Sequence, residues 1–229
     1  LLELHAGELS HYALAEARGL SSLGYVFMTF NARRLSRKYH TKAGAVALRS
    51  GNPSAIAFAW FTLGSLDFFE GLWDACETDF EKSATAYREA GDIHGWGGAQ
   101  LLLTFVIYFR GNLPLAVKLN SELVHAGEDA AEPQVASWGY QNLGYPGLAA
   151  GPLDEAIASL RKGQALAAKI PAWQNLVYEM GLLAKCHVLQ GRLDDARAIL
   201  GEAFRIIKVE KMNLPFDQAE VLTAQATVD

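Results

Sequence analysis

The chain has 229 residues, of which 51% are hydrophobic and 20% are charged, so it can build a packed core and lacks the composition of a disordered protein. Its formal net charge of −5 argues against direct binding of nucleic acid, because phosphate binding needs a basic surface. No apolar run approaches the roughly 18 to 20 residues needed to cross a bilayer, so we expect no membrane association.

The two cysteines favour a reducing compartment over a secreted disulfide framework, and Cys76 and Cys186 lie too far apart in sequence for a compact metal motif. We therefore expect a cytoplasmic protein without a metal or other cofactor. The sequence begins without a methionine and stops after Val228-Asp229, so we expect it to be a piece of a longer protein. The basic residues between positions 33 and 42 wrap around a predicted helix, which indicates a solvated face.

A period of 40 residues organises the chain. Each copy has a turn residue, a leucine eight positions before it, and small residues seven positions before and five positions after it. The turn residues are Asn31, Gly71, Gly111, Gly151 and Gly191. The leucines are Leu23, Leu63, Leu103, Leu143 and Leu183. The small residues are Gly24, Gly64, Thr104, Gly144 and Ala184 before the turn, and Ser36, Cys76, Ala116, Ala156 and Ala196 after it.

Apolar residues recur at spacings of three and four on both sides of each turn, which is typical of amphipathic helices. Glycine at the turn favours the left-handed conformation that closes a helix, and a short loop makes the next helix antiparallel. Small residues let the two helices of a pair cross closely. In chain order the pattern predicts helix pairs at 8–29 with 32–50, 53–70 with 73–90, 94–110 with 113–127, 132–150 with 153–169 and 172–190 with 193–210, and a final helix at 215–227.

Such pairs cannot bury their apolar faces alone, so they stack. The predicted fold class is all-α: a right-handed α-solenoid of five antiparallel helix pairs and a final helix. No low-complexity linker interrupts the series, and we expect residues 1–229 to form one continuous domain.

The pattern resembles the tetratricopeptide repeat, most clearly in Trp60-x-x-Leu63-Gly64 followed by Gly71-x-Trp73-x-x-Cys76. The family's period is usually about 34 residues, so the helices or loops here are longer. Longer units of this kind resemble the repeats that follow ATP-binding modules in large bacterial regulators, such as transcription activators of the maltose-regulator type and cyclase-linked multidomain proteins. The resemblance implies a protein-interaction scaffold within a signalling or transcription regulator.

In the family the first helix of each pair lines a concave groove that binds a peptide or helix. Carried over by repeat position, the groove residues are Tyr25, Phe58, Phe61, Phe68, Phe69, Phe105, Tyr108, Phe109, Trp138, Gln141, Tyr145, Tyr178 and Lys185. An aromatic stripe at this spacing is either inter-repeat core or an open apolar groove, and an open groove of this size implies a partner. Because Lys185 is the one cation among these positions, we do not expect the groove to bind an acidic peptide terminus.

Pro146 falls inside the predicted helix 132–150, where it removes an amide donor and clashes with the carbonyl of Asn142. We expect a kink or break there. The break would be a tolerated irregularity, or it would open a small ligand pocket beside Tyr145, Trp138 and Gln141.

Catalytic motifs are missing from the sequence: it contains no phosphate-binding loop, and its histidines lack the spacing of metal ligands. We expect a scaffold that binds a polypeptide, from its own parent chain or from another protein, and not an enzyme. A small-ligand-sensing domain of a regulator is the alternative. The last helix leaves an apolar edge at Val221 and Leu222 that could pair two copies as a homodimer.

Overall fold

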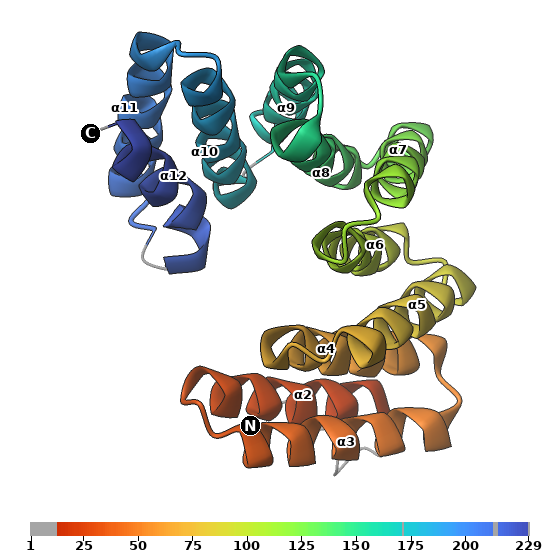
Figure 1. The fold of residues 1–229 in the computed structure, drawn as a ribbon. Helices are drawn as coiled ribbons and strands as arrows, with labels where there is room; N and C mark the ends of the chain where they lie inside the picture. The colour runs from red at the N-terminus through yellow and green to blue at the C-terminus, as the bar shows by residue number, and fades with distance from the viewer. Residues whose placement is uncertain (1–12, 171, 213–214, 229) are drawn as a thin grey trace. The chain divides into compact units, whose positions relative to one another are not determined.

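The structure, a computed structural model, describes residues 13–170, 172–212 and 215–228. Within these ranges every regular element is an α-helix, and successive helices run antiparallel (Figure 1). The helices are α2 (Ala13–Thr29), α3 (Arg33–Ser50), α4 (Pro53–Glu70), α5 (Trp73–Glu89), α6 (Ile93–Phe109), α7 (Leu113–Asp129), α8 (Pro133–Ala150), α9 (Leu153–Ala167), α10 (Trp173–Leu189), α11 (Leu193–Val209) and α12 (Pro215–Val228).

The predicted all-α fold of five helix pairs and a final helix is confirmed. The predicted bounds agree with the observed ones to within two residues, except that the predicted start of the first helix lies outside the described residues. In the described part of the chain, no helix is both long enough and apolar enough to cross a membrane.

The chain forms two compact units, Leu1–Ile107 and Tyr108–Asp229, with the boundary inside α6. Among the described residues, unit 1 has a core cluster between α2, α3 and α4, and unit 2 has one between α9 and α10 and another between α10, α11 and α12. That the whole chain behaves as one continuous domain stays a prediction.

Small residues let the helices of a pair approach closely, as predicted. A methyl group added at Gly24 would come within 2.5 Å of the His40 ring, and one added at Gly144 would come within 2.8 Å of Leu160. The small positions that follow the turns are all buried; they are Ser36, Cys76, Ala116, Ala156 and Ala196. Because a larger side chain at these positions would push the helices apart, the 40-residue pattern directly encodes the packing of each pair.

The turns repeat every 20 residues rather than every 40. Left-handed backbone angles occur at Asn31, Gly51, Gly71, Gly91, Gly111, Ala131, Gly191 and Lys211. In six of these turns the amide of the following residue donates to the carbonyl five positions earlier, at 2.8–3.0 Å, as from Leu72 to Asp67. This bond closes a helix with a left-handed residue. The connections within pairs and those between pairs therefore share one geometry, although the 40-residue sequence pattern marks mainly the turns within pairs.

Among the turns that the structure describes, Gly151 is the exception, and the prediction of a left-handed turn is wrong there. Its φ is −123° and its ψ is −172°, so the backbone is extended. The next residue, Pro152, has no amide hydrogen and cannot make the closing bond of the other turns. Proline also disfavours helical angles in the residue before it. These two effects account for the different turn between α8 and α9.

The predicted break at Pro146 does not occur, because α8 is one continuous helix from Pro133 to Ala150. Pro146 is buried in a helix that packs against both α7 and α9, and this packing holds the helical backbone despite the lost amide donor. Pro146 and Tyr145 line different hollows, since neighbouring helical residues point about 100° apart. The predicted pocket beside Tyr145, Trp138 and Gln141 required a break that α8 does not have, and neither Trp138 nor Gln141 lines the hollow of Tyr145.

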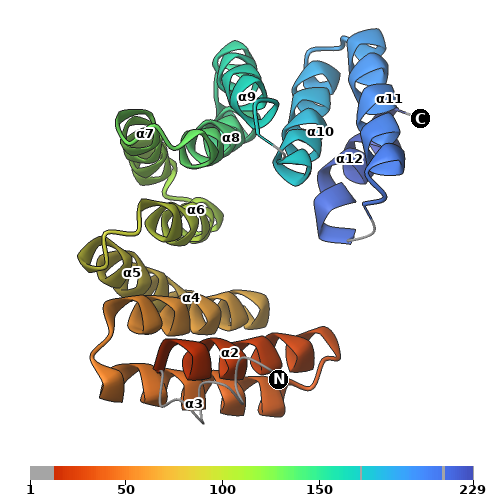
Figure 2. The ribbon, with the colours of Figure 1, turned by 180° about the vertical axis from the view of Figure 1, so that it is seen from behind.

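The last helix, α12, lies beside α10 and α11 in both views of the ribbon (Figures 1 and 2). Its backbone approaches α10 at Gly181, where an added methyl group would come within 2.6 Å of Glu220. Val221, Ala224 and Val228 are buried in the α10–α12 core. The prediction that Val221 lies on an exposed edge is thus wrong, while its neighbour Leu222 is exposed.

Candidate functional site

A hollow of about 310 Å³ lies in unit 2 where α8, α10 and α12 meet the end of α6. We call it the tyrosine hollow. Its lining residues are Tyr108, Tyr145, Leu148, Ala149, Leu182, Lys185, Val188, Leu189, Glu220 and Thr227. The walls are mostly aromatic or aliphatic, with Lys185, Glu220 and Thr227 as the polar part. Hollows of this kind, apolar with a few fixed polar groups, are typical of binding sites.

The tyrosine hollow is built from repeated positions. Tyr108, Leu148 and Val188 are separated by 40 residues each, and so are Tyr145 and Lys185. Equivalent positions on successive first helices lie in rows, because each helix pair stacks on the next in the same register. The hollow therefore combines two rows of the repeat with side chains from α12.

The aromatic wall is held by ring contacts. The Tyr108 and Tyr145 ring centroids are 5.2 Å apart with the rings tilted by 54°, and the Tyr145 and Tyr178 centroids are 6.4 Å apart. Tyr108 also makes an edge contact with Phe109, at 5.3 Å between centroids. Tilted and edge-on pairs of this kind are favourable arrangements of aromatic rings. The wall is thus preformed before any ligand arrives.

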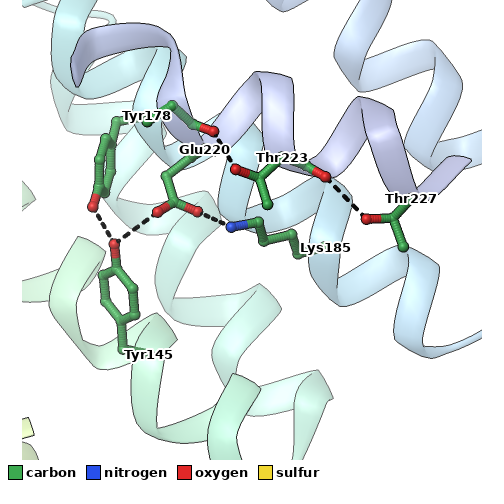
Figure 3. Close-up of polar contacts among 7 residues, drawn as sticks. Tyr145, Tyr178, Lys185, Glu220, Thr223 and Thr227 are labelled. Atoms are coloured by element: carbon green, nitrogen blue, oxygen red, sulfur yellow. Dashed lines mark hydrogen bonds and ion pairs between the residues drawn. The ribbon is translucent and has the colours of Figure 1, made fainter. Parts of the chain in front are cut away.

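At the polar part, side chains from α8 and α10 converge on Glu220 of α12 (Figure 3). The Lys185 Nζ forms an ion pair with Glu220 Oε2. The Tyr145 hydroxyl donates a long hydrogen bond of 3.5 Å to Glu220 Oε1 and also bonds to the Tyr178 hydroxyl. In the bond between the two hydroxyls, either tyrosine could be the donor. Both oxygens of Glu220 are therefore satisfied within unit 2.

Burial raises the pKa of Tyr145, and the neighbouring Tyr178 and Glu220 raise it further. Burial likewise raises the pKa of Tyr178, although its hydrogen bond with Tyr145 acts in the opposite direction. Both phenols are therefore protonated over the physiological range and serve as hydrogen-bond donors and acceptors, not as bases.

Four of the predicted groove residues thus come together at or beside the tyrosine hollow: Tyr108, Tyr145, Tyr178 and Lys185. Phe109 is exposed next to Tyr108, whereas Trp138 is half-buried and Gln141 is buried on α8. The buried amide of Gln141 contributes to packing.

In unit 1, most of the predicted groove residues pack against their own helix pairs. Tyr25 makes an edge contact with the buried His40, and Phe61 packs against Phe80. Phe58 lies under the guanidinium of Arg18. Phe68 contacts both Phe69 and Trp73, and Phe105 is buried in α6. Among these residues Phe69 is the one with a mostly exposed ring.

A second hollow, of about 390 Å³, lies in unit 1 beside Phe69, at the turn between α2 and α3. Glu70 lines it and pairs with Arg37 of α3, which also donates to Asp67 at 2.6 Å. The neighbouring basic residues Arg33, Arg34, Lys38 and Lys42 are exposed, in agreement with the predicted solvated face. In the described ranges, no three His, Cys, Asp or Glu side chains come together as metal ligands would.

Sequence reasoning missed Glu220, Leu148, Val188 and Leu189. The 40-residue period could have found Leu148 and Val188, because they occupy the repeat position of Tyr108. Glu220 carries no such signal, since it lies on the unpaired final helix and meets Lys185 across 35 positions of sequence.

No protein-family model matches the chain, and no curated protein matches it. Solved structures do resemble it. BtubC (BKLC) from P. vanneervenii aligns with a TM-score of 0.74 and 15% identity, over 93% of this chain and 90% of that one. The TPR-like repeats of a putative kinesin light chain from P. anserina align with a TM-score of 0.65 and 14% identity, over 86% and 97% of the two chains.

A signal transduction ATPase with numerous domains (STAND) from Pyrococcus horikoshii, which has a tetratricopeptide repeat sensor, aligns with a TM-score of 0.70 and 13% identity. The match covers 94% of this chain and 33% of that protein, so the chain spans about a third of its length. At such identities the likeness concerns the fold alone. The chain has a tetratricopeptide-like repeat fold of sequential antiparallel helix pairs.

Proposed function

We propose that the chain is a protein-interaction domain and that the tyrosine hollow of unit 2 receives apolar side chains from a bound polypeptide segment. The observation that supports this most is the convergence of Tyr108, Tyr145 and Lys185, three residues of the predicted groove, on one partly open apolar hollow. Tetratricopeptide-like folds generally serve protein interaction, but fold alone does not assign a partner.

The energetics favour a ligand with apolar side chains. Leu189 lines the hollow with 60% of its surface exposed, and Phe109 beside Tyr108 is 56% exposed. Burying a fully exposed apolar side chain of this size contributes about 1.5–3 kcal/mol, so covering the part of each that is still exposed contributes roughly half of that. Covering these side chains together with the hollow would give a partner several such contributions, which is the pattern of an interface with a few dominant residues.

The layout favours a polypeptide over an isolated small molecule. Tyr108, Leu148 and Val188 form a row of equivalent positions across successive first helices. A helix or extended segment can place side chains along such a row at regular intervals. The segment could belong to the parent chain or to a separate protein, and in either case the proposed site is the same.

Binding without catalysis is part of the proposal. The charged groups of the hollow, Lys185 and Glu220, are paired with each other, and the Tyr145 and Tyr178 hydroxyls are held by hydrogen bonds. We also propose a cytoplasmic location, because the two cysteines favour a reducing compartment over a secreted disulfide framework.

The test is affinity capture from the source cell with two matched variants. Leu189 and Val209 are the last residues of α10 and α11, and both are 60% exposed, but only Leu189 lines the tyrosine hollow. An aspartate at either position places a negative charge at the carboxyl end of a helix, where the helix dipole disfavours it, so the two variants carry the same cost. We expect Leu189→Asp to lose a protein that the parent chain and Val209→Asp both retain. Equal retention by all three proteins would refute the hollow as the binding surface.

A ligand-sensing domain of a larger regulator is the second candidate. It is favoured by the likeness to the STAND protein, which has a tetratricopeptide repeat sensor. Since each helix pair contacts its neighbours only, a ligand that changes one contact can change the curvature of the stack. A small molecule from cell extract that raises the melting temperature of the parent chain, and not of Leu189→Asp, would favour this candidate.

A further inference from the structure

Glu220 differs from the other residues of the tyrosine hollow, because it reaches in from the final helix and carries a charge. Its carboxylate lies between the Tyr145 hydroxyl and the Lys185 ammonium (Figure 3). The side chains of Lys185 and Glu220 retain 26% and 16% of their exposure, so the pair is only partly shielded from solvent. A ligand in the hollow would therefore meet both charges.

The position of Glu220 is fixed by the packing of α12. The α12 backbone lies directly on Gly181, and Val221, Ala224 and Val228 are buried against α10 and α11. These contacts hold the carboxylate at the Lys185 side of the hollow in the absence of a ligand. The ion pair is thus a built feature of unit 2, and not a chance contact of a loose terminus.

The pair makes the hollow electrically neutral. Among the described residues that line it, Lys185 is the one cationic side chain and Glu220 is the one anionic side chain. Without Glu220, the Lys185 ammonium and the Tyr145 hydroxyl would together form a site for a carboxylate, since an ammonium and a phenol both donate hydrogen bonds to it. With Glu220 present, an incoming carboxylate meets a like charge at the place where it would bind.

We infer that Glu220 determines the specificity of the tyrosine hollow: it occupies the carboxylate position and so selects partner segments whose inserted side chain is uncharged and aromatic or aliphatic. This inference rests on the proposed function, because it assumes that the hollow receives a side chain. The inference agrees with the prediction that the groove does not bind an acidic peptide terminus. The reason differs: the prediction rested on the small number of cations, whereas here the Lys185 ammonium is present but already paired with Glu220.

The test uses two probes of nearly identical shape, indole-3-acetamide and indole-3-acetate, which differ in charge. Binding is measured from the methyl resonances of Leu182 and Leu189 in the intact 229-residue chain. We expect the wild type to prefer the neutral amide. Glu220→Gln should raise the ratio of acetate to amide affinity by about fivefold to tenfold, as removal of a partly shielded like charge implies. Lys185→Gln should lower the same ratio.

Opposite changes of the affinity ratio in the two variants cannot come from a general loss of folding, because unfolding would weaken the binding of both probes alike. If both probes bind but the ratio stays the same in Glu220→Gln, Glu220 does not set specificity, and the inference fails while the hollow remains a binding site. If neither probe binds to the wild type or to the variants, the hollow accepts no side chain, and the proposed function fails at this site as well.

Discussion

Replacing Glu179 with glutamine should change how the stability of the chain depends on pH. Glu179 is on α10 and has no exposed surface, and its Oε1 lies 3.0 Å from the Ser137 hydroxyl of α8. Burial raises the pKa of Glu179 to about 9, with the Ser137 hydrogen bond acting the other way. The Ser137 Oγ also lies 3.4 Å from the Gly163 carbonyl, so a protonated Glu179 can donate to Ser137 while Ser137 donates to Gly163.

The folded chain therefore keeps a proton on Glu179 up to about pH 9, whereas the unfolded chain loses it above the ordinary pKa of about 4.5. Between these values the folded state binds one more proton than the unfolded state, so the free energy of unfolding falls as pH rises. The slope from one such group is at most about 1.4 kcal/mol per pH unit. Glu179→Gln removes this slope, so the free energy of unfolding of the variant should rise by about 4 kcal/mol relative to that of the wild type between pH 5 and pH 8.

The assay is urea denaturation of both proteins at pH 5, 6, 7 and 8, followed by circular dichroism. The quantity compared is the difference in the free energy of unfolding between variant and wild type, because ionisations common to both cancel. Glu202→Gln is the control: the Arg205 hydrogen bond lowers the pKa of Glu202, so this variant should show no trend above pH 5. A difference for Glu179→Gln that stays constant from pH 5 to pH 8 would refute the argument from burial.

Four further substitutions test the packing and the turns, each by its free energy of unfolding. Gly181→Ala should destabilise the chain by about 1–3 kcal/mol, because the new methyl group would meet Glu220 at 2.6 Å, whereas Gly201→Ala has open space around it and should stabilise its helix by about 1 kcal/mol. Asn52→Ala should cost about 1 kcal/mol, because the side chain accepts a hydrogen bond of 3.0 Å from a backbone amide at the start of α4. Ala131→Gly should stabilise the chain by about 1 kcal/mol, since a φ of 53° strains alanine and not glycine. A change of the opposite sign in any of the four variants would contradict the packing or turn described for it.

Most of the fold could be predicted because its determinants are local and repeated. A turn residue such as Gly71 and a small residue such as Gly64 recur at fixed spacing, so each copy supports the boundaries of the others. The different turn at Gly151 was also visible in the sequence, since Pro152 cannot supply the closing amide. The continuous helix through Pro146 could not be predicted from the local sequence, because it depends on packing against α7 and α9.

The candidate site was predictable only in part. Tyr108, Tyr145 and Lys185 follow from their repeat positions, but the same rule selected Phe105 and Gln141, which are buried. A repeat position fixes which way a side chain leaves its helix, and the neighbouring side chains decide whether it stays exposed. Glu220 was not predicted, because its position in the hollow depends on where α12 packs, and no local sequence pattern indicates that packing.

The claim that the tyrosine hollow is a protein-binding surface is tested most directly by photocrosslinking in the source cell. A benzophenone amino acid would replace Leu189 in one protein and Val209 in another, two positions of equal exposure that differ in their distance from the hollow. The account predicts a covalent adduct with one partner protein from position 189 and no such adduct from position 209. The same adduct from position 209, or none from 189, would contradict it.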